Sequence, residues 1–312
     1  MTLLLLLATL PALSWAQPVE TAPAVRRADV GRLYVPPEAV AAWEQAGFTA
    51  LPFGETERAA RVELQVPGIA GRAEIASATN RPWVDANGWR FVRRPDGRFR
   101  CDVPGRSAAL AAAEAFAYGA DVVLGVEPGG LEEFGRMLAF ARSVPALDLP
   151  AAADLVIEED SSGPFEEILN LMARGNLLFR VGRGSLAGGP LEVRIGSKEF
   201  PRESAEDPAA FAVAVRRRLT DDRRSLRLYG SEAVLGRLAR DGSRARLHLL
   251  NYGGRPIEGL RVRLLGTWAQ PQALVFGEGL RTVEDYVRRD GATEFSLPIL
   301  GPYAVIDLAA AR

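Results

Sequence analysis

The periodicity of the apolar residues changes near Leu226, and this change constrains the fold more than any other feature of the 312-residue sequence. Before that point, short apolar runs alternate with helical patterns, which is typical of βαβ units and a parallel sheet. After it, apolar residues such as Leu247, Leu249, Leu260 and Val262 alternate with polar ones, so one face of each strand is buried. We therefore predict an α/β region followed by an antiparallel β-sandwich.

The α/β region is expected to contain two parts, separated by the proline-bounded stretch that ends at Pro150. The first part begins with a strand, a helix opened by two prolines and a second strand, which is the pattern of a parallel sheet. Its length favours an incomplete barrel-like or open sheet, because a full eightfold barrel needs about 250 residues. The predicted domains are residues 31–150 (α/β), 151–225 (a flavodoxin-like α/β unit) and 226–312 (the sandwich of five or six strands).

The N-terminus has the pattern of a secretory signal peptide. Five leucines occupy Leu3 to Leu7, and Ser14 and Ala16 are small residues at a cleavage site before Gln17. The apolar run is shorter than the roughly 20 residues that span a bilayer. We therefore expect residues 1–16 to be removed, residues 17–30 to form a flexible leader, and the mature protein to be exported to the periplasm or medium without an integral membrane segment.

Composition excludes several functions. The formal net charge is −1, and arginines are spread along the chain, which disfavours binding to nucleic acid. Cys101 and His248 are the only cysteine and histidine, so the sequence supports no internal disulfide, no multi-histidine or thiolate metal site and no cofactor. Carboxylate chemistry, or no chemistry at all, is left.

The best candidate for a binding loop lies between Trp83 and Trp89, where two tryptophans flank Asp85 and Asn87. The tryptophans are expected to stack on a sugar and Asn87 to bind a hydroxyl, while Trp89 to Val92 is expected to be a strand. Retaining hydrolysis needs two carboxyl groups about 5 Å apart. We assign Asp85 as the first and Glu127, at the end of a predicted strand, as the second; a turn, a helix start and core tryptophans are the alternative.

Three parts of the chain resemble glycoside hydrolases. The strand Arg246–Tyr252 and the last strand, Tyr303–Leu308, resemble the all-β tail at the carboxyl end of many of these enzymes. Residues 154–219 resemble the flavodoxin-like or amidotransferase-like domain of bacterial β-galactosidases, and residues 106–126 the last helix and strand of their barrel. The resemblance implies glycoside-hydrolase-like ancestry, but without a full barrel no catalytic residue of that family is carried over.

Two functions remain. The first is an exported carbohydrate-associated protein, whose partner is an oligosaccharide bound by the Trp83 to Trp89 loop. The second is a non-catalytic assembly or protein-interaction module that forms a homo-oligomer, in which the two tryptophans are buried. A serine hydrolase has the least support, because the sequence has no Gly-x-Ser-x-Gly elbow.

Overall fold

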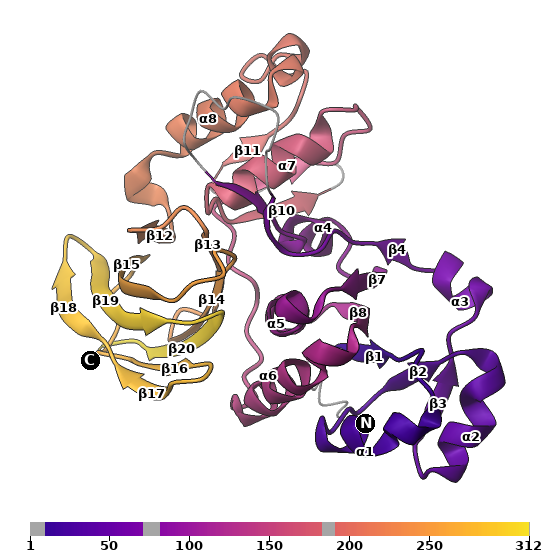
Figure 1. The fold of residues 1–312 in the computed structure, drawn as a ribbon. Coiled ribbons are helices and arrows are strands. Elements are labelled where there is room, and N and C mark those ends of the chain that lie inside the picture. Colours follow the sequence, from indigo (N-terminus) through magenta and orange to yellow (C-terminus); the bar gives the residue numbers. More distant parts are fainter. Residues whose placement is uncertain (1–9, 71–81, 183–190, 312) are drawn as a thin grey trace, which may run out of the picture. The chain divides into compact units, whose positions relative to one another are not determined.

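The computed structural model describes residues 10–70, 82–182 and 191–311 (Figure 1). The chain divides into two compact units. The first unit consists of Met1–Ala70 and Arg94–Asp148, and the second consists of Gly71–Arg93 and Leu149–Arg312. The described segment 82–93 therefore folds with the second unit, although in the sequence it lies between the two parts of the first.

The first unit is built on a parallel sheet with the strand order β3-β2-β1-β8-β7-β4. Strand β1 pairs with β2 on one side and with β8 on the other, so the start and the end of the unit meet in the middle of the sheet. The described strands leave β3 and β4 as edges, and the predicted open α/β sheet is confirmed. The strands are β1 (Ala12–Ser14), β2 (Leu33–Val35), β3 (Ala50–Pro52), β4 (Val62–Glu63), β7 (Arg98–Val103) and β8 (Asp121–Val126); β5 (Gly68–Ala70) follows β4.

Helices of the first unit pack closely on one another. Gly135 lies so near the end of α1 that a Cβ there would stand 2.6 Å from Ala28 Cα, so only glycine permits this approach. The alanine-rich helix α5 is buried along most of its length and ends at Gly119, whose φ of 62° is left-handed. The helices are α1 (Ala22–Arg27), α2 (Val40–Gln45), α3 (Glu55–Ala59), α5 (Ala108–Tyr118) and α6 (Leu131–Ser143).

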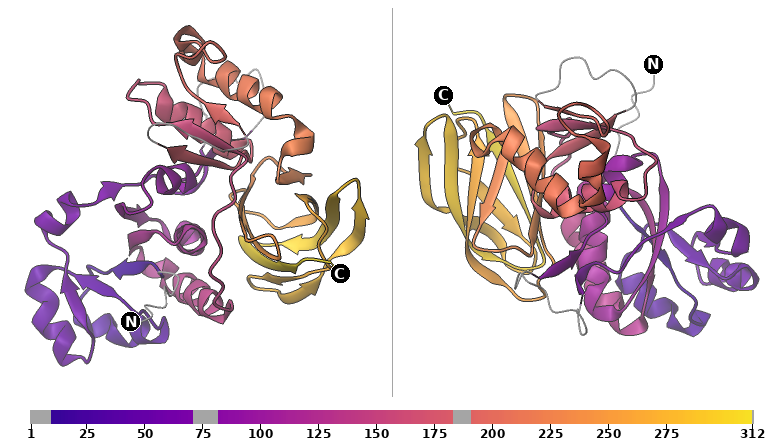
Figure 2. Two further views of the ribbon diagram at one scale, coloured as in Figure 1. Left: turned by 180° about the vertical axis from the view of Figure 1, so that it is seen from behind. Right: turned by 90° about the horizontal axis from the view of Figure 1, so that it is seen from above.

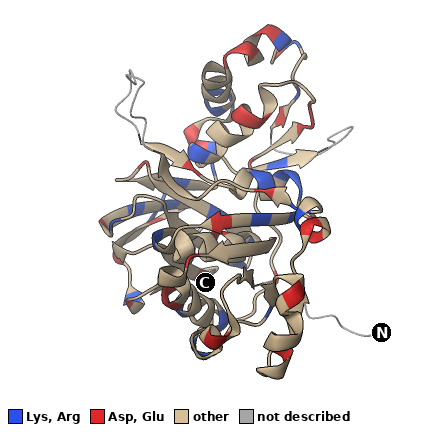
Figure 3. Cartoon of the chain, turned by 45° about the vertical axis from the view of Figure 1, so that its right-hand side comes forward, with Lys and Arg blue, Asp and Glu red and all other residues tan. Residues whose placement is uncertain are grey.

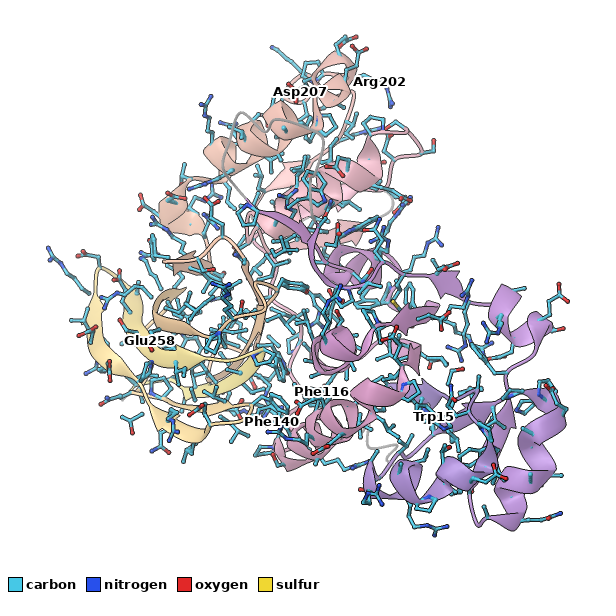
Figure 4. The ribbon with its side chains drawn as sticks, in the orientation of Figure 1. Trp15, Phe116, Phe140, Arg202, Asp207 and Glu258 are labelled. Atoms are coloured by element: carbon cyan, nitrogen blue, oxygen red, sulfur yellow. The ribbon has the colours of Figure 1, made fainter. Side chains whose placement is uncertain are left out.

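Strand β1 uses residues that the sequence pattern assigned to a signal peptide. Leu13 is fully buried, and Trp15, labelled in Figure 4, donates a hydrogen bond from Nε1 to Thr21 Oγ1 at 2.9 Å. The expected flexible leader, residues 17–30, contains α1, in which Val25 is fully buried. Cleavage after Ala16 would remove β1 from the first unit. The leucine run itself lies outside the described residues.

A network of arginines and carboxylates lies at the amino ends of β7 and β8. Arg61, only 5% exposed, pairs with Glu57 at 2.9 Å and with Asp121 at 3.5 Å, and its Nη1 donates to Phe99 O at 3.3 Å. Arg98 pairs with the same two carboxylates from a more exposed position. In barrel-like sheets the amino-end face serves stability while the carboxyl ends carry chemistry, so we regard this network as structural.

The second unit begins with a three-stranded parallel sheet in the order β10-β9-β11. Its apolar core includes Trp89 from the early segment together with Phe165 and Phe211. Asp207, labelled in Figure 4, caps α8 by accepting from Ala210 N at 2.9 Å, as the Asp-Pro start of this helix predicts. The elements are β9 (Leu155–Glu158), β10 (Phe179–Gly182), β11 (Glu192–Val193), α7 (Phe165–Arg174) and α8 (Pro208–Leu219).

Residues Trp89 to Val92 form part of a helix, α4 (Gly88–Arg93), and the predicted strand is wrong. The short apolar run gives no clear period, so the sequence alone does not separate the two structures. In the helix, Trp89 and Val92 lie three residues apart and both pack on the apolar core of this unit. Tertiary packing therefore decides the local structure.

The C-terminal sandwich contains nine strands, more than the five or six expected (Figure 2). Its sheets have the orders β12-β15-β19-β18 and β13-β14-β20-β16-β17, and apolar residues such as Leu247, Val262, Phe295 and Ile306 fill the core. The strands are β12 (Leu226–Tyr229), β13 (Val234–Arg240), β14 (Arg244–Asn251), β15 (Ile257–Leu265), β16 (Gln272–Val275), β17 (Gly279–Thr282), β18 (Glu284–Arg289), β19 (Ala292–Leu300) and β20 (Tyr303–Ala309).

Polar contacts join the three-stranded sheet to the sandwich within the second unit. Asn176, in left-handed backbone with φ 51°, donates from Nδ2 to Val234 O at 2.9 Å and accepts from Gly236 N at 2.7 Å. Its amide thereby pairs with β13 as a neighbouring strand would. Asp154, 3% exposed, accepts from Ser225 N at 2.9 Å; burial raises the pKa of Asp154 despite the hydrogen bonds from Ser225.

Charged residues of both signs are interspersed on helices and strands (Figure 3). None of the helices in the described ranges combines the length and the apolar character needed to cross a membrane.

Deletion of residues 1–16 is expected to unfold the first unit. The deletion exposes the edges of β2 and β8, and burial of Leu13 alone contributes about 1.5–3 kcal/mol. Thermal unfolding followed by circular dichroism would compare the full chain with residues 17–312. Residues 10–312, which keep β1, are the control and should fold. Identical melting of the full chain and residues 17–312 would show that β1 is dispensable.

Substitution Arg61→Ala is expected to lower the free energy of unfolding by about 2–3 kcal/mol, because buried hydrogen bonds to charged groups are lost. Arg98→Ala is the matched control, since Arg98 pairs with the same carboxylates but is exposed and should cost less than about 1 kcal/mol. Urea unfolding followed by tryptophan fluorescence measures both. If the two variants lose the same free energy of unfolding, burial does not make Arg61 more important than Arg98.

Candidate functional site

The predicted binding loop folds in the second unit as strand β6 (Trp83–Asp85) followed by α4. Trp83 Nε1 donates a hydrogen bond to Asp85 Oδ1 at 3.1 Å, which fixes the orientation of the two side chains relative to each other. The guanidinium of Arg174 lies 4.0 Å from the centre of the Trp83 ring and covers one face of it. Trp83 and Asp85 are both partly exposed, and thus remain within reach of a ligand.

Asn87 and Trp89 have a more internal position. Asn87 is 2% exposed, and its carbonyl accepts from Arg90 N at 2.8 Å at the start of α4. Trp89 is 4% exposed, packs in the apolar core and has the Arg90 guanidinium 4.2 Å from its ring centre. Burial of Trp89 is what the assembly hypothesis expects, whereas a sugar platform needs an open ring face.

Acidic residues after β9 are held by arginines. Glu159 pairs with Arg93 at 2.7 Å, and Asp160 pairs with Arg202 at 3.0 Å. Hydrogen bonding from Ser162, followed by the pairing with Arg202, lowers the pKa of Asp160. These ion pairs order the loop at the carboxyl end of β9, and the negative charge is neutralised there.

Glu127 lies in the first unit, directly after β8, whereas Asp85 lies in the second. Neither unit by itself contains both members of the carboxyl pair predicted from the sequence. Glu127 is exposed, and its Oε2 accepts a hydrogen bond from Gly105 N at 3.1 Å. Gly105 starts the 3-10 helix η3 (Gly105–Ser107) after β7, so Glu127 connects the carboxyl ends of two neighbouring strands.

Asp102, which the sequence analysis did not single out, shares this edge of the sheet. It lies on β7 opposite Gly125 of β8, and Glu127 follows Gly125 by two residues, one past the end of β8, with φ −58° and ψ 146°. Side chains two residues apart in a strand share a face, so Asp102 and Glu127 project from the same side. Strand spacings place their Cα atoms about 8 Å apart.

Gly125 makes room for the Asp102 carboxylate, because a Cβ at Gly125 would overlap with it. The alternating run from Arg98 to Val103, with an acid next to its end, is the signal that would have identified Asp102. We call Asp102, Gly125 and Glu127 the carboxyl-edge site.

The backbone of this edge is tightly packed. After β8, the 3-10 helix η4 (Pro128–Gly130) lies against η3, and a Cβ on Gly105 would stand 2.9 Å from Gly130 N. Nothing lies within 4 Å of where a Cβ of Gly129 would be. The edge therefore offers two exposed carboxylates on a close-packed glycine backbone.

The cysteine and the histidine, Cys101 and His248, are both buried. Burial, and then Glu114, raises the pKa of Cys101 to about 12, so its thiol is not a nucleophile at neutral pH. Within residues 10–70, 82–182 and 191–311, no group of three or more His, Cys, Asp or Glu side chains is placed to hold a metal ion.

His248 lies on β14 with its side chain on the face opposite the sandwich core, as the alternation predicts, but it is only 8% exposed. Its Nδ1 lies 2.6 Å from Tyr303 Oη. Burial lowers the pKa of His248 well below the ordinary value, with Arg237 and Arg246 adding to the effect. The folded protein therefore keeps this imidazole neutral.

The stability of the protein is expected to fall as the pH drops below about 6.5, because the unfolded chain then binds a proton that folded His248 does not. The loss reaches at most about 1.4 kcal/mol per pH unit. Urea unfolding at pH 7.5, 6.5 and 5.5 measures it. His248→Gln should make the free energy of unfolding less dependent on pH in this range. The chain has one histidine, so an unchanged pH dependence in this variant would show that His248 is not the cause.

No family model matches the chain, and no curated protein sequence matches it. Among solved structures, it is similar to α-L-fucosidase isoenzyme 2 from Paenibacillus thiaminolyticus, with a TM-score of 0.56 and 9% identity over 93% of this chain and 79% of that one. A rhamnosidase from Novosphingobium sp. PP1Y follows with a TM-score of 0.46 and 12% identity, over 91% of this chain and 38% of the rhamnosidase.

At this identity the similarity to the fucosidase shows a shared fold and nothing more. The glycoside-hydrolase-like architecture expected from the sequence is thereby confirmed at the level of the fold. This chain has an N-terminal parallel α/β sheet followed by antiparallel sheets.

Proposed function

We propose that this protein binds carbohydrate at the carboxyl-edge site and does not cleave it. The observation that carries the proposal is the position of Asp102 and Glu127: neighbouring parallel strands present two carboxylates at their carboxyl ends, where barrel and open-sheet proteins bind ligands. The fold shared with an α-L-fucosidase supports a sugar as the ligand. Carboxylate oxygens accept hydrogen bonds from sugar hydroxyls.

Two features favour binding over hydrolysis. A glycosidase needs one carboxyl group that an apolar setting keeps protonated, whereas Asp102 and Glu127 are both exposed. Glu127 is also held by a hydrogen bond from Gly105 N at 3.1 Å, which fixes it beside the end of β7. In addition, the described sheet is open and has six strands, whereas a catalytic barrel has eight.

The Trp83 to Trp89 loop is proposed as a separate saccharide contact within the second unit, formed by Trp83 and Asp85. The more specific ancestry, the carboxyl-terminal part of a β-galactosidase-type enzyme, is likewise proposed, supported by the residues that resemble that part. Export is proposed from the leucine run, with the condition that any processing leaves β1 in place.

A non-catalytic assembly module remains the second candidate, and exposed apolar residues at the open edges of the first sheet favour it. Leu51 on β3 is 38% exposed and Val62 on β4 is 37% exposed. An edge strand with exposed apolar side chains is a site for pairing with another chain. A second copy of this chain is the simplest partner for these edges.

Calorimetry of the full chain against L-fucose, L-rhamnose, D-galactose and their oligosaccharides tests the proposal. Glu127→Gln and Asp102→Asn are each expected to weaken binding about tenfold, as loss of a hydrogen bond to a charged group predicts. Gly125→Ala should do the same by displacing the Asp102 carboxylate. Glu132→Gln, an exposed carboxylate on α6, is the matched control and should bind like the parent.

Assays of the same variants with p-nitrophenyl glycosides are expected to show no turnover. If the parent protein hydrolyses a glycoside and Glu127→Gln abolishes that activity, the function is catalysis and not binding alone. If no sugar binds and light scattering shows a dimer that Leu51→Lys dissociates, the assembly module is the function.

A further inference from the structure

The C-terminal sandwich has an open pocket of about 590 Å³ in the second unit, whereas the carboxyl-edge site belongs to the first. Gln270, Gln272, Thr282 and Asp307 contribute polar side chains to its lining, and Ala309 contributes a small one. The pocket lies on the face of the five-stranded sheet that is turned away from the sandwich core, since Ala273 and Ile306, the neighbours in sequence, are buried in that core. All of these residues belong to the second unit.

The polar side chains form a row that crosses four strands in register. Arg246 on β14 is opposite Asp307 on β20, Asp307 is opposite Gln272 on β16, and Gln272 is opposite Thr282 on β17. Residues directly opposite one another in a sheet share a face, with Cβ atoms about 5 Å apart. The row therefore presents a carboxylate, an amide and a hydroxyl at the spacing of neighbouring strands.

The row is charge-neutral. Arg246, with only 9% of its side chain exposed, binds Asp307 through two hydrogen bonds of 2.6 and 2.7 Å. This forked pairing fixes the carboxylate and leaves its remaining lone pairs toward the pocket, where 41% of the Asp307 side chain is exposed. A charged ligand would meet no net opposite charge in this row.

The small side chain of Ala309, beside the row, leaves space for a ligand. Ala309 follows Asp307 by two residues on the same face, and Gln270 precedes Gln272 by two. Gln270 Nε2 reaches Val283 O at 3.5 Å, which leaves its amide oxygen as an acceptor. A larger side chain at position 309 would fill the space between Gln270 and Asp307.

We propose that this pocket is a second ligand site and binds a neutral polyhydroxylated ligand, namely a saccharide. Amide groups both donate and accept hydrogen bonds, as sugar hydroxyls do, and the paired carboxylate adds a strong acceptor. The apolar lining residues are Ala269, Pro271 and Ala309, and no lining residue is aromatic. Hydrogen bonds therefore replace stacking, and the dissociation constant for a monosaccharide is expected near 1 mM. The site is independent of the carboxyl-edge site and does not rest on it.

Side-chain amide resonances in ¹H–¹⁵N spectra of the full chain test the proposal, with D-glucose, D-galactose, L-fucose, glycerol and glucuronate as probes. Saturable shifts of the Gln270 and Gln272 amides with a neutral monosaccharide are expected. Ala309→Leu should abolish them, and Gln272→Ala should raise the dissociation constant about fivefold. Gln45→Ala, an exposed glutamine on α2, is the matched control and should leave the shifts unchanged.

Several outcomes would overturn the proposal. The first is the absence of a saturable shift at sugar concentrations up to 50 times the expected dissociation constant of about 1 mM. The second is tighter binding of glucuronate than of neutral sugars, and the third is binding of glycerol as tight as that of a sugar. The fourth is binding that survives Ala309→Leu. Glu127→Gln separates the two sites. If it weakens calorimetric binding about tenfold while the Gln272 shift persists, both proposals hold. If the Gln272 shift disappears with this substitution, the pocket is not an independent site.

Discussion

The pairing of β1 with β8 holds the first unit together. In the order β3-β2-β1-β8-β7-β4, this ladder is the junction between strands from the start of the unit and strands from its end. Without it the sheet would separate into two small halves, each with a new open edge. The carboxyl-edge site depends on the same junction, because β8 carries Gly125 and Glu127 and is held in place between β1 and β7.

Much of the fold follows from the sequence, because periodicity records which faces are buried. The change near Leu226, the helix opened by Asp207 and Pro208, and the β-branched strand before Glu127 all appear where their patterns predict. At the N-terminus the apolar pattern is ambiguous for a physical reason. A buried parallel strand and the end of a signal peptide are both short apolar runs, so Ala12–Ser14 satisfies both descriptions.

The candidate sites were harder to predict than the fold. Asp85 and Glu127 are separate in sequence, and no local pattern reports that they belong to different units. Asp102 matters only because β7 and β8 are neighbours, which is a property of the sheet order. The sandwich pocket likewise arises from the register of four strands, and register between distant strands is not written in any single segment.

The path of the chain has a consequence for synthesis. Segment 82–93 emerges from the ribosome before the first unit is complete, yet Trp89 packs with Phe165 and Phe211 of the second unit. Until those later residues appear, this indole has no apolar core to enter. The native contacts of Trp89 therefore form only after the chain has passed through the whole of the first unit.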